Sequence, residues 1–324
     1  MSGRYLARKL VQAAITIALI VAVNFFLFRA MPGGPERAIG HNPNVSAASI
    51  AALRERWGLD KPLFPDQFVD YVVASLHGDF GYSIKYQGQP VSDVIAQQIW
   101  PTVLLVGLGT ILSVILGLAL GAAAGWRRGR WPDYAGTALS QALYAMPSFW
   151  LGMILLVVFA TGLGWFPSFG MSTAGAVYSS WIDNVIDVGS HLALPLATFT
   201  LGYMGEYSLI MRSSLIETLG EDYITTARAK GLEGSRILRE HALPNAMLPT
   251  VTIIALNVGY IVAGALTIEY VFSWPGLGTM TVDALGARDY PILQALFLLL
   301  SVCVVLANLL ADIIYGFLDP RVKV

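Results

Sequence analysis

Long apolar segments separated by short charged ones limit the fold of this chain more than any other feature. A helix needs about 20 mostly apolar residues to cross a bilayer, and we predict a spanning helix wherever the sequence offers such a stretch. The predicted spans are Leu10–Phe28, Thr102–Gly125, Ala135–Leu163, His191–Met211, Leu248–Val271 and Pro291–Phe317. The sequence therefore predicts an all-α polytopic membrane protein with six transmembrane helices.

The composition supports a surface that lipid covers in part. Charged residues make up 13% of the chain and hydrophobic residues 56%, whereas soluble domains carry about 25% charged residues. The net charge of −1 gives no indication of a nucleic-acid partner. The single cysteine, Cys303, excludes a disulfide framework within the chain, and its apolar run predicts a small buried hydrophobic residue.

Basic residues predict the orientation, because lysines and arginines are retained on the cytoplasmic side. With six spans, four basic clusters fall on one side: Arg4–Lys9, Arg127–Arg130, Arg212–Arg239 and Arg321–Lys323. The opposite segment 164–190 has no lysine or arginine, and segment 272–290 has only Arg288. Both termini are therefore predicted to be cytoplasmic. The first apolar run exceeds that of a signal peptide, which predicts an uncleaved anchor.

The long connections divide the chain into two parts. Residues 1–100 are predicted to form one spanning helix and a small folded appendage outside the cell, with helices at 49–57 and 68–76. Residues 101–324 are predicted to form a five-helix core that contains a cytoplasmic loop at 212–247. Within the second span, Gly117, Gly121 and Gly125 recur at every fourth position, which favours close approach of another helix.

The cytoplasmic loop carries the pattern of two short helices. Residues 221–230 have acids in the first turn and bases in the last, as the helix dipole prefers, and Gly231 is predicted to end this helix. Ser235 is predicted to cap a second helix, and Pro244 to end it. Such a pair fits a groove on a soluble partner. A plain loop with a capping glycine is the alternative that these residues leave open.

The same loop resembles the EAA loop of ABC-importer permeases. Ala227 matches the third position of the E-A-A motif, Gly231 matches its glycine and Leu243-Pro244 its ending, whereas Thr225, Thr226 and His241 depart from the pattern. The run E-D-Y-x-x-T-A-R-A-K-G-L is similar to the version in dipeptide and oligopeptide permeases. So are Phe272–Gly278 and Gly78–Ser83. The resemblance covers nearly the whole chain and is greatest to the first of the two permease subunits.

The resemblance implies a type I ABC-importer permease with several partners. These are a second permease subunit, two ATPase subunits or domains that bind ATP and Mg, an extracytoplasmic substrate-binding protein or lipoprotein, and the bilayer of a bacterial or archaeal cell membrane. The implied cargo is short peptides, with nickel or another small solute as the alternative. The residues implied in ATPase coupling are Glu221, Asp222, Tyr223, Thr225, Thr226, Ala227, Arg228, Lys230, Gly231, Leu243 and Pro244.

The sequence predicts no chemistry of its own for the chain. It has no G-x-x-x-x-G-K-[ST] nucleotide loop, and no lysine follows a glycine. The four histidines are scattered without metal-ligand spacing. We therefore expect a non-catalytic subunit without a cofactor or metal, and we expect ATP to be hydrolysed by a partner.

Polar residues within spans are candidates for the translocation path. Glu206 is the sharpest candidate, with packing or snorkelling as its alternative role, and Arg212 is too far along the helix to pair with it. The residues predicted to line the path or form an outer gate are Glu206, Asn257, Glu269, Phe272 and Trp274. The alternative function, a secondary transporter driven by an ion gradient, would use Glu206 as its coupling carboxylate.

Overall fold

The structure, a computed structural model, describes residues 3–30, 60–86, 88–247, 250, 254 and 265–318, with the backbone alone for 314–318. Within these ranges the chain is helical, and its only strand-like feature is an isolated bridge between Tyr82 and Pro90. The predicted helix at 49–57 and most of the fifth span, with Asn257, lie outside the described residues.

Among the described residues, four helices are long and apolar enough to cross a membrane, and a bent pair adds a fifth candidate. The four are α1 (Gly3–Ala30), α5 (Val91–Trp126), α8 (Trp181–Thr218) and α13 (Tyr290–Leu318). They confirm the predicted spans in these places, but α5 and α8 begin about ten residues earlier than expected. Because α8 has 38 residues at about 1.5 Å each, it is longer than the hydrocarbon core is thick.

The predicted third span is not one straight helix. It consists of α6 (Trp131–Ala145), α7 (Ser148–Leu155) and the π-helical turns η2 (Leu156–Gly162), and the two arms meet at 104°. Pro147 has no N–H to donate and disfavours helical geometry in the residue before it. Met146 is accordingly extended, with φ −78° and ψ 130°. This proline therefore breaks the span where the sequence predicted continuity.

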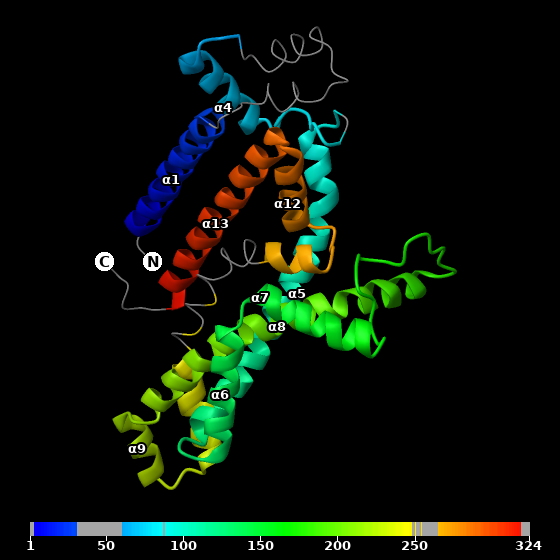
Figure 1. Cartoon of the computed structure of the whole chain (residues 1–324). Helices are drawn as coiled ribbons and strands as arrows, with labels where there is room; N and C mark the ends of the chain where they lie inside the picture. Colours follow the sequence, from blue (N-terminus) through cyan, green and yellow to red (C-terminus); the bar gives the residue numbers. More distant parts are fainter. Residues whose placement is uncertain are drawn as a thin grey trace.

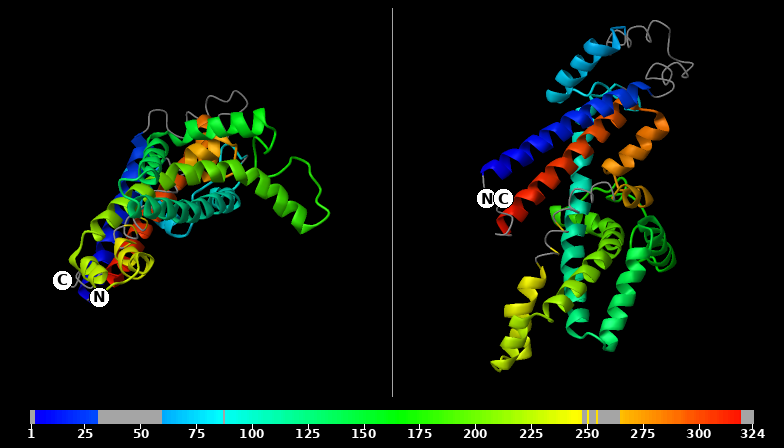
Figure 2. Two further views of the ribbon diagram at one scale, coloured as in Figure 1. Left: turned by 90° about the horizontal axis from the view of Figure 1, so that it is seen from below. Right: turned by 90° about the vertical axis from the view of Figure 1, so that its left-hand side faces the viewer.

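The helices form two groups that α5 connects (Figure 1). In one group α5 and α6 pack against α8, and in the other α1 packs along α13 beside α12 (Leu277–Ala287). The outer appendage contains η1 (Leu63–Gln67) and α4 (Phe68–Leu76), which confirms the predicted helix at 68–76. A short helical segment, α9 (Asp222–Ala229), lies at the end of the molecule opposite α4 in both Figure 1 and Figure 2.

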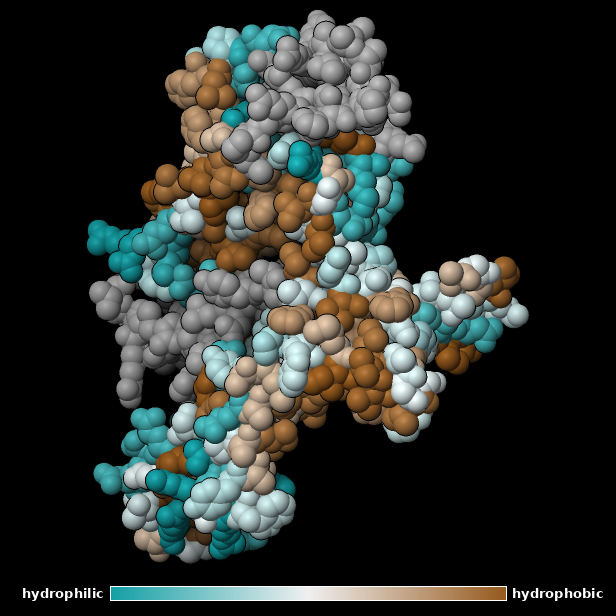
Figure 3. All heavy atoms as spheres, viewed as in Figure 1, coloured by the Kyte–Doolittle hydropathy of each residue, from teal (hydrophilic) through white to brown (hydrophobic). Residues whose placement is uncertain are grey.

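Hydrophobic and hydrophilic side chains occupy different parts of the surface. In Figure 3 hydrophobic side chains cover much of the middle of the visible face, and hydrophilic ones gather at the α9 end. On α1 many of the exposed side chains are aliphatic, including Val11 at 57%, Leu19 at 61% and Val23 at 61% exposure. Such a face is suited to lipid or to another apolar helix.

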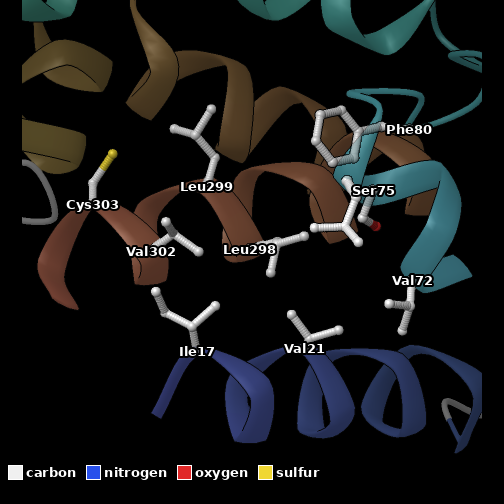
Figure 4. Close-up of a pocket in the computed structure, with 10 residues that line it drawn as sticks. Ile17, Val21, Val72, Ser75, Phe80, Leu298, Leu299, Val302 and Cys303 are labelled. Carbon is white, nitrogen blue, oxygen red and sulfur yellow. The ribbon is translucent and has the colours of Figure 1, made fainter. Parts of the chain in front are cut away.

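The prediction that Cys303 is buried is wrong, because this residue is exposed in the chain. It lies at the edge of an apolar crevice of about 390 Å³ between α1, α4 and α13, where Ile17, Val21 and Val302 also point inward (Figure 4). An apolar run does not distinguish core from lipid-facing positions, since both are hydrophobic in a membrane protein.

Candidate functional site

The first helix of the cytoplasmic loop forms where local signals place it. Glu221 is the N-cap of α9 with an extended backbone, Asp222 lies in the first turn and Arg228 in the last. After the helix Gly231 has φ +76°, a left-handed conformation that favours glycine. The N–H groups of Leu232 and Gly231 donate to the carbonyls of Ala227 and Arg228, at 3.3 and 2.9 Å. These two bonds form a Schellman motif, so the predicted helix and its glycine end are confirmed.

The loop continues through α10 (Gly234–Arg236) and the π-helical turns η3 (Ile237–Ala242). Two expectations about this part are wrong. The N-cap of α10 is Glu233, and Ser235 lies within the helix rather than capping it. Residues 243–247 are helical, so Pro244 does not end the helix. The wider π-helical turns immediately before Pro244 account for this, because they change the hydrogen-bond pattern that a proline would otherwise interrupt.

One side of the loop is fixed to the ends of α5 and α8. Ile224 is fully buried, Ala227 is 6% exposed and Ile237 is 2% exposed. They form one apolar cluster with Met211 and Leu215 of α8, and Trp126 at the end of α5 packs against it. In addition, the hydroxyl of Ser214 on α8 donates to the carbonyl of Ala246 at 2.8 Å. Movement of α9 therefore has to move α8 as well, because close-packed side chains transmit displacement.

The other side of the loop is exposed. Of the residues predicted to couple, Ala227 is buried and Leu243 half-buried, and the rest are exposed: Glu221, Asp222, Tyr223, Thr225, Thr226, Arg228, Lys230, Gly231 and Pro244. Desolvation by its surroundings, and to a smaller extent the Glu221 carboxylate, raises the pKa of Tyr223. This exposed face, which we call the α9 face, combines charges of both signs with an aromatic ring.

A charge pair fixes α6 to α8 near this loop. The guanidinium of Arg212 on α8 donates to both carboxylate oxygens of Asp133, at 2.5 and 3.0 Å. Asp133 is also bonded by the N–H of Gly129 at 2.9 Å and by the Thr137 hydroxyl. The sequence predicted that Arg212 would not pair with Glu206, but it did not indicate Asp133 as the partner.

We expect Asp133→Asn to lower the free energy of unfolding by about 3 kcal/mol, because it leaves Arg212 without its counter-charge. The apparent Tm of the purified protein measures the loss. The matched control is Glu240→Gln, which breaks the exposed pair between Arg236 and Glu240 and should change stability by less than about 1 kcal/mol. Equal effects of the two changes would contradict a special role for the α6–α8 pair.

A second polar cluster, which we call the outer clasp, surrounds the fully buried Glu269. Its carboxylate accepts hydrogen bonds from the Thr102 hydroxyl at 2.7 Å and from the N–H groups of Gly278 and Thr279, at 2.6 and 3.4 Å. The N–H of Leu277 donates to Thr102 at 2.8 Å. These N–H groups belong to the first turn of α12, so Glu269 and Thr102 together cap that helix.

The aromatic residues of this motif are core residues within the chain. Trp274 is fully buried, and its indole N–H donates to the carbonyl of Pro101 at 2.9 Å. Phe272 is 1% exposed. Glycine is required beside them, since a Cβ on Gly276 or Gly278 would approach the Glu269 carboxylate too closely. The structure thus gives Glu269, Phe272 and Trp274 packing roles, and their part in an outer gate stays a prediction.

Asp289 is a structural residue that the sequence analysis did not identify. It is fully buried and accepts from the Ser83 hydroxyl at 2.6 Å and from the Lys85 N–H at 2.8 Å. It also accepts from the N–H of Ile292 in the first turn of α13, at 3.3 Å. It thereby ties the Gly78–Ser83 motif to the last helix. An aspartate two residues before Pro291 is a typical helix start and could have indicated this role.

The fold and these sites define a class: a multi-pass membrane subunit with a helical loop presented at one end. The C-terminal part matches the family of binding-protein-dependent transport system inner membrane components over residues 113–324. Residues 2–105 match the N-terminal family of the same transport-system membrane components. The chain therefore belongs to the inner membrane components of binding-protein-dependent transport systems, a family of transporter permease subunits.

Curated relatives extend over the full chain. The glutathione transport system permease protein GsiC of Salmonella typhimurium is 39% identical over 320 residues, with 98% of each chain covered. The oligopeptide transport system permease protein AppB of Bacillus subtilis is 35% identical over 319 residues, with 98% of this chain and 99% of the relative covered. Among solved structures, the MetNI methionine ABC transporter in inward-facing conformations matches the fold with a TM-score of 0.58 and 17% identity. The match covers 72% of this chain and all of that one.

Proposed function

We propose that this chain forms one half of the translocation pathway of an ATP-driven importer of short peptides. Family membership supports the transport role, and the cargo follows from relatives that are named for glutathione and oligopeptide transport. The chain lacks a nucleotide loop, so partner subunits hydrolyse ATP and hold its Mg. Its own contribution is to bind, enclose and release the peptide.

The proposed complex contains a second permease subunit, two ATPase subunits or domains and an extracytoplasmic binding protein. The basic clusters support a cytoplasmic location for both termini and for loop 212–247. The ends of α1 and α13 are tied together by Lys9 and Asp312, 2.8 Å apart. The opposite positions of α4 and α9 are compatible with this orientation (Figure 2). The proposal therefore puts the appendage outside, where a binding protein would dock.

The observation that carries the proposal is the two-sided construction of the loop. Its buried side is packed on α8 and α5, and the α9 face is free for a partner. A helix with this construction fits into a groove of an ATPase. When ATP changes the relative orientation of the two ATPases, the groove displaces α9, and α8 follows. ATP shifts the transporter between its states only through this difference in contacts.

Purification and uptake test the proposal together. The tagged chain, extracted gently from its native membrane, should retain a second multi-pass subunit and an ATPase with a nucleotide loop. In proteoliposomes that contain ATP on the loop side, the complex with its binding protein should accumulate a labelled dipeptide. A chain that purifies alone, or that accumulates solute on an ion gradient without ATP, would contradict the proposal.

Gly231 offers a specific test of coupling. Its φ of +76° disfavours branched residues, while no neighbour lies within 4 Å of a Cβ placed there. Gly231→Val should therefore strain the loop by about 1–2 kcal/mol without a clash in this chain, and we expect dipeptide uptake to fall about tenfold at normal membrane levels. Gly231→Asn is the control, because asparagine tolerates this conformation. Normal uptake by Gly231→Val would show that coupling does not depend on this glycine.

A further inference from the structure

In the described part of the chain, the helix α8 packs against α5 on one face and α6 on another, and it also contacts α7 and Ala246. One face lies against α5: a Cβ on Gly117 would be 2.7 Å from both the Met204 carbonyl oxygen and the Tyr207 Cβ. A second face lies against α6, where Ser140 donates to Ser208 at 2.8 Å and Asp133 pairs with Arg212. The remaining face points away from both helices.

This remaining face carries a carboxylate, unlike the mostly aliphatic exposed face of α1. It carries residues at alternating spacings of three and four, and we call them the α8 stripe: Tyr203, Glu206, Ile210 and Ser213. They are half-buried or exposed. The chain thus has a mostly aliphatic surface on α1 and a surface with a carboxylate, a phenol and a hydroxyl on α8. Lipid disfavours the second kind of surface, whereas a water-filled path requires it.

Glu206 differs from three other acids of the bundle in its contacts with the described residues. Asp133, Glu269 and Asp312 each have an ion pair or hydrogen bonds within the chain. Among the described residues, none forms a hydrogen bond or ion pair with the Glu206 carboxylate. A carboxylate on a spanning helix that has no hydrogen-bond donor beside it is stabilised by water or by a cation that approaches it.

Two aromatic rings lie on the N-terminal side of this carboxylate. The Phe199 and Tyr203 rings are in contact, with centroids 4.6 Å apart and planes tilted by 33°. Tyr203 precedes Glu206 by three residues, so both side chains project from the same face of α8. A carboxylate beside an aromatic ring attracts an organic ammonium group by charge and by the cation–π interaction.

We infer that Glu206 and Tyr203 form a subsite for the N-terminal ammonium group of the transported peptide. The inference rests on the proposed function and adds to it the end of the peptide that this subunit holds. The α8 stripe continues through Ile210 and Ser213 toward the α9 end of the helix. A peptide whose ammonium lies at Glu206 would therefore contact the helix that the coupling loop moves.

Binding to the complex without binding protein and without ATP tests the subsite, because the binding protein then contributes no selection of its own. Two ligands of equal skeleton are compared by equilibrium dialysis: alanyl-alanine and propionyl-alanine, which has a hydrogen in place of the ammonium group. The wild-type complex should bind alanyl-alanine at least tenfold more tightly. Glu206→Gln should reduce this preference to less than twofold and leave the affinity for propionyl-alanine unchanged.

The controls separate recognition from folding and from the proposed function. Asp93→Asn, an exposed acid in the first turn of α5, should keep the full preference, and Glu206→Asp should keep part of it. If Glu206→Gln does not assemble, Tyr203→Leu should still lower the preference about threefold or more. Equal weakening of both ligands, or an unchanged preference in Glu206→Gln, would overturn the subsite. A wild-type complex that fails in ATP-driven dipeptide uptake would instead overturn the proposed function.

Discussion

Replacing Glu269 by alanine is expected to lower the free energy of unfolding by about 3–5 kcal/mol. The change removes the acceptor of the Thr102 hydroxyl and of the Gly278 N–H, which lie at 2.7 and 2.6 Å from the carboxylate. Each buried donor that is left unpaired costs about 1–3 kcal/mol, and the lost negative charge no longer faces the N-terminus of α12. The apparent Tm of the purified complex, followed by the loss of monodisperse protein on heating, measures the effect.

Two further variants test whether the outer clasp acts through these hydrogen bonds. Glu269→Gln keeps one acceptor oxygen, and we expect its Tm to lie between those of Glu269→Ala and the wild type. Glu217→Ala removes an exposed carboxylate from α8 and should leave the Tm unchanged. If Glu269→Ala melted within about one degree of the wild type, the clasp would contribute packing alone, and the hydrogen bonds of the carboxylate would be irrelevant to stability.

The parts of the structure that the sequence predicted correctly depend on signals within a few residues. The acids and bases of α9 and the glycine that follows it lie within a single short segment, and the helix ends where they indicate. The spans of α1 and α13 follow in the same way from continuous apolar runs. Hydropathy alone predicts these two helices, because their apolar length has to match the bilayer and does not depend on which helices pack beside them.

The parts that the sequence did not predict depend on residues far apart in the chain. Thr102 and Glu269 are 167 positions apart, and Asp133 and Arg212 are 79 apart. No periodicity or composition connects such pairs, so the sequence did not indicate that the Glu269 carboxylate caps a helix. The effect of the two prolines was also predicted incorrectly. Pro147 breaks a span that was predicted to be continuous, and Pro244 does not end its helix. The surrounding backbone, rather than the proline alone, decides between these outcomes.

The glycines of α5 permit a comparison of two chemically identical changes on one helix. We expect Gly121→Ala to destabilise the protein by about 1–3 kcal/mol, because a Cβ there would collide with the Ser208 carbonyl and lie 2.9 Å from the Met211 Cβ. A backbone atom cannot rotate away, so α5 and α8 must separate. Gly107 has no neighbour within 4 Å of its Cβ position, and Gly107→Ala should stabilise α5 by up to about 1 kcal/mol through helix propensity.

The difference between these two variants isolates the contact of α5 with α8. Thermal unfolding should therefore give Tm shifts of opposite sign, and dipeptide uptake should fall only for Gly121→Ala, since separation of α5 from α8 also disturbs the packing beneath α9. Gly121→Val enlarges the collision and should prevent assembly of the complex. Similar stability of Gly107→Ala and Gly121→Ala would mean that the helices are held apart in the membrane, and that α8 can move independently of α5 when α9 is displaced.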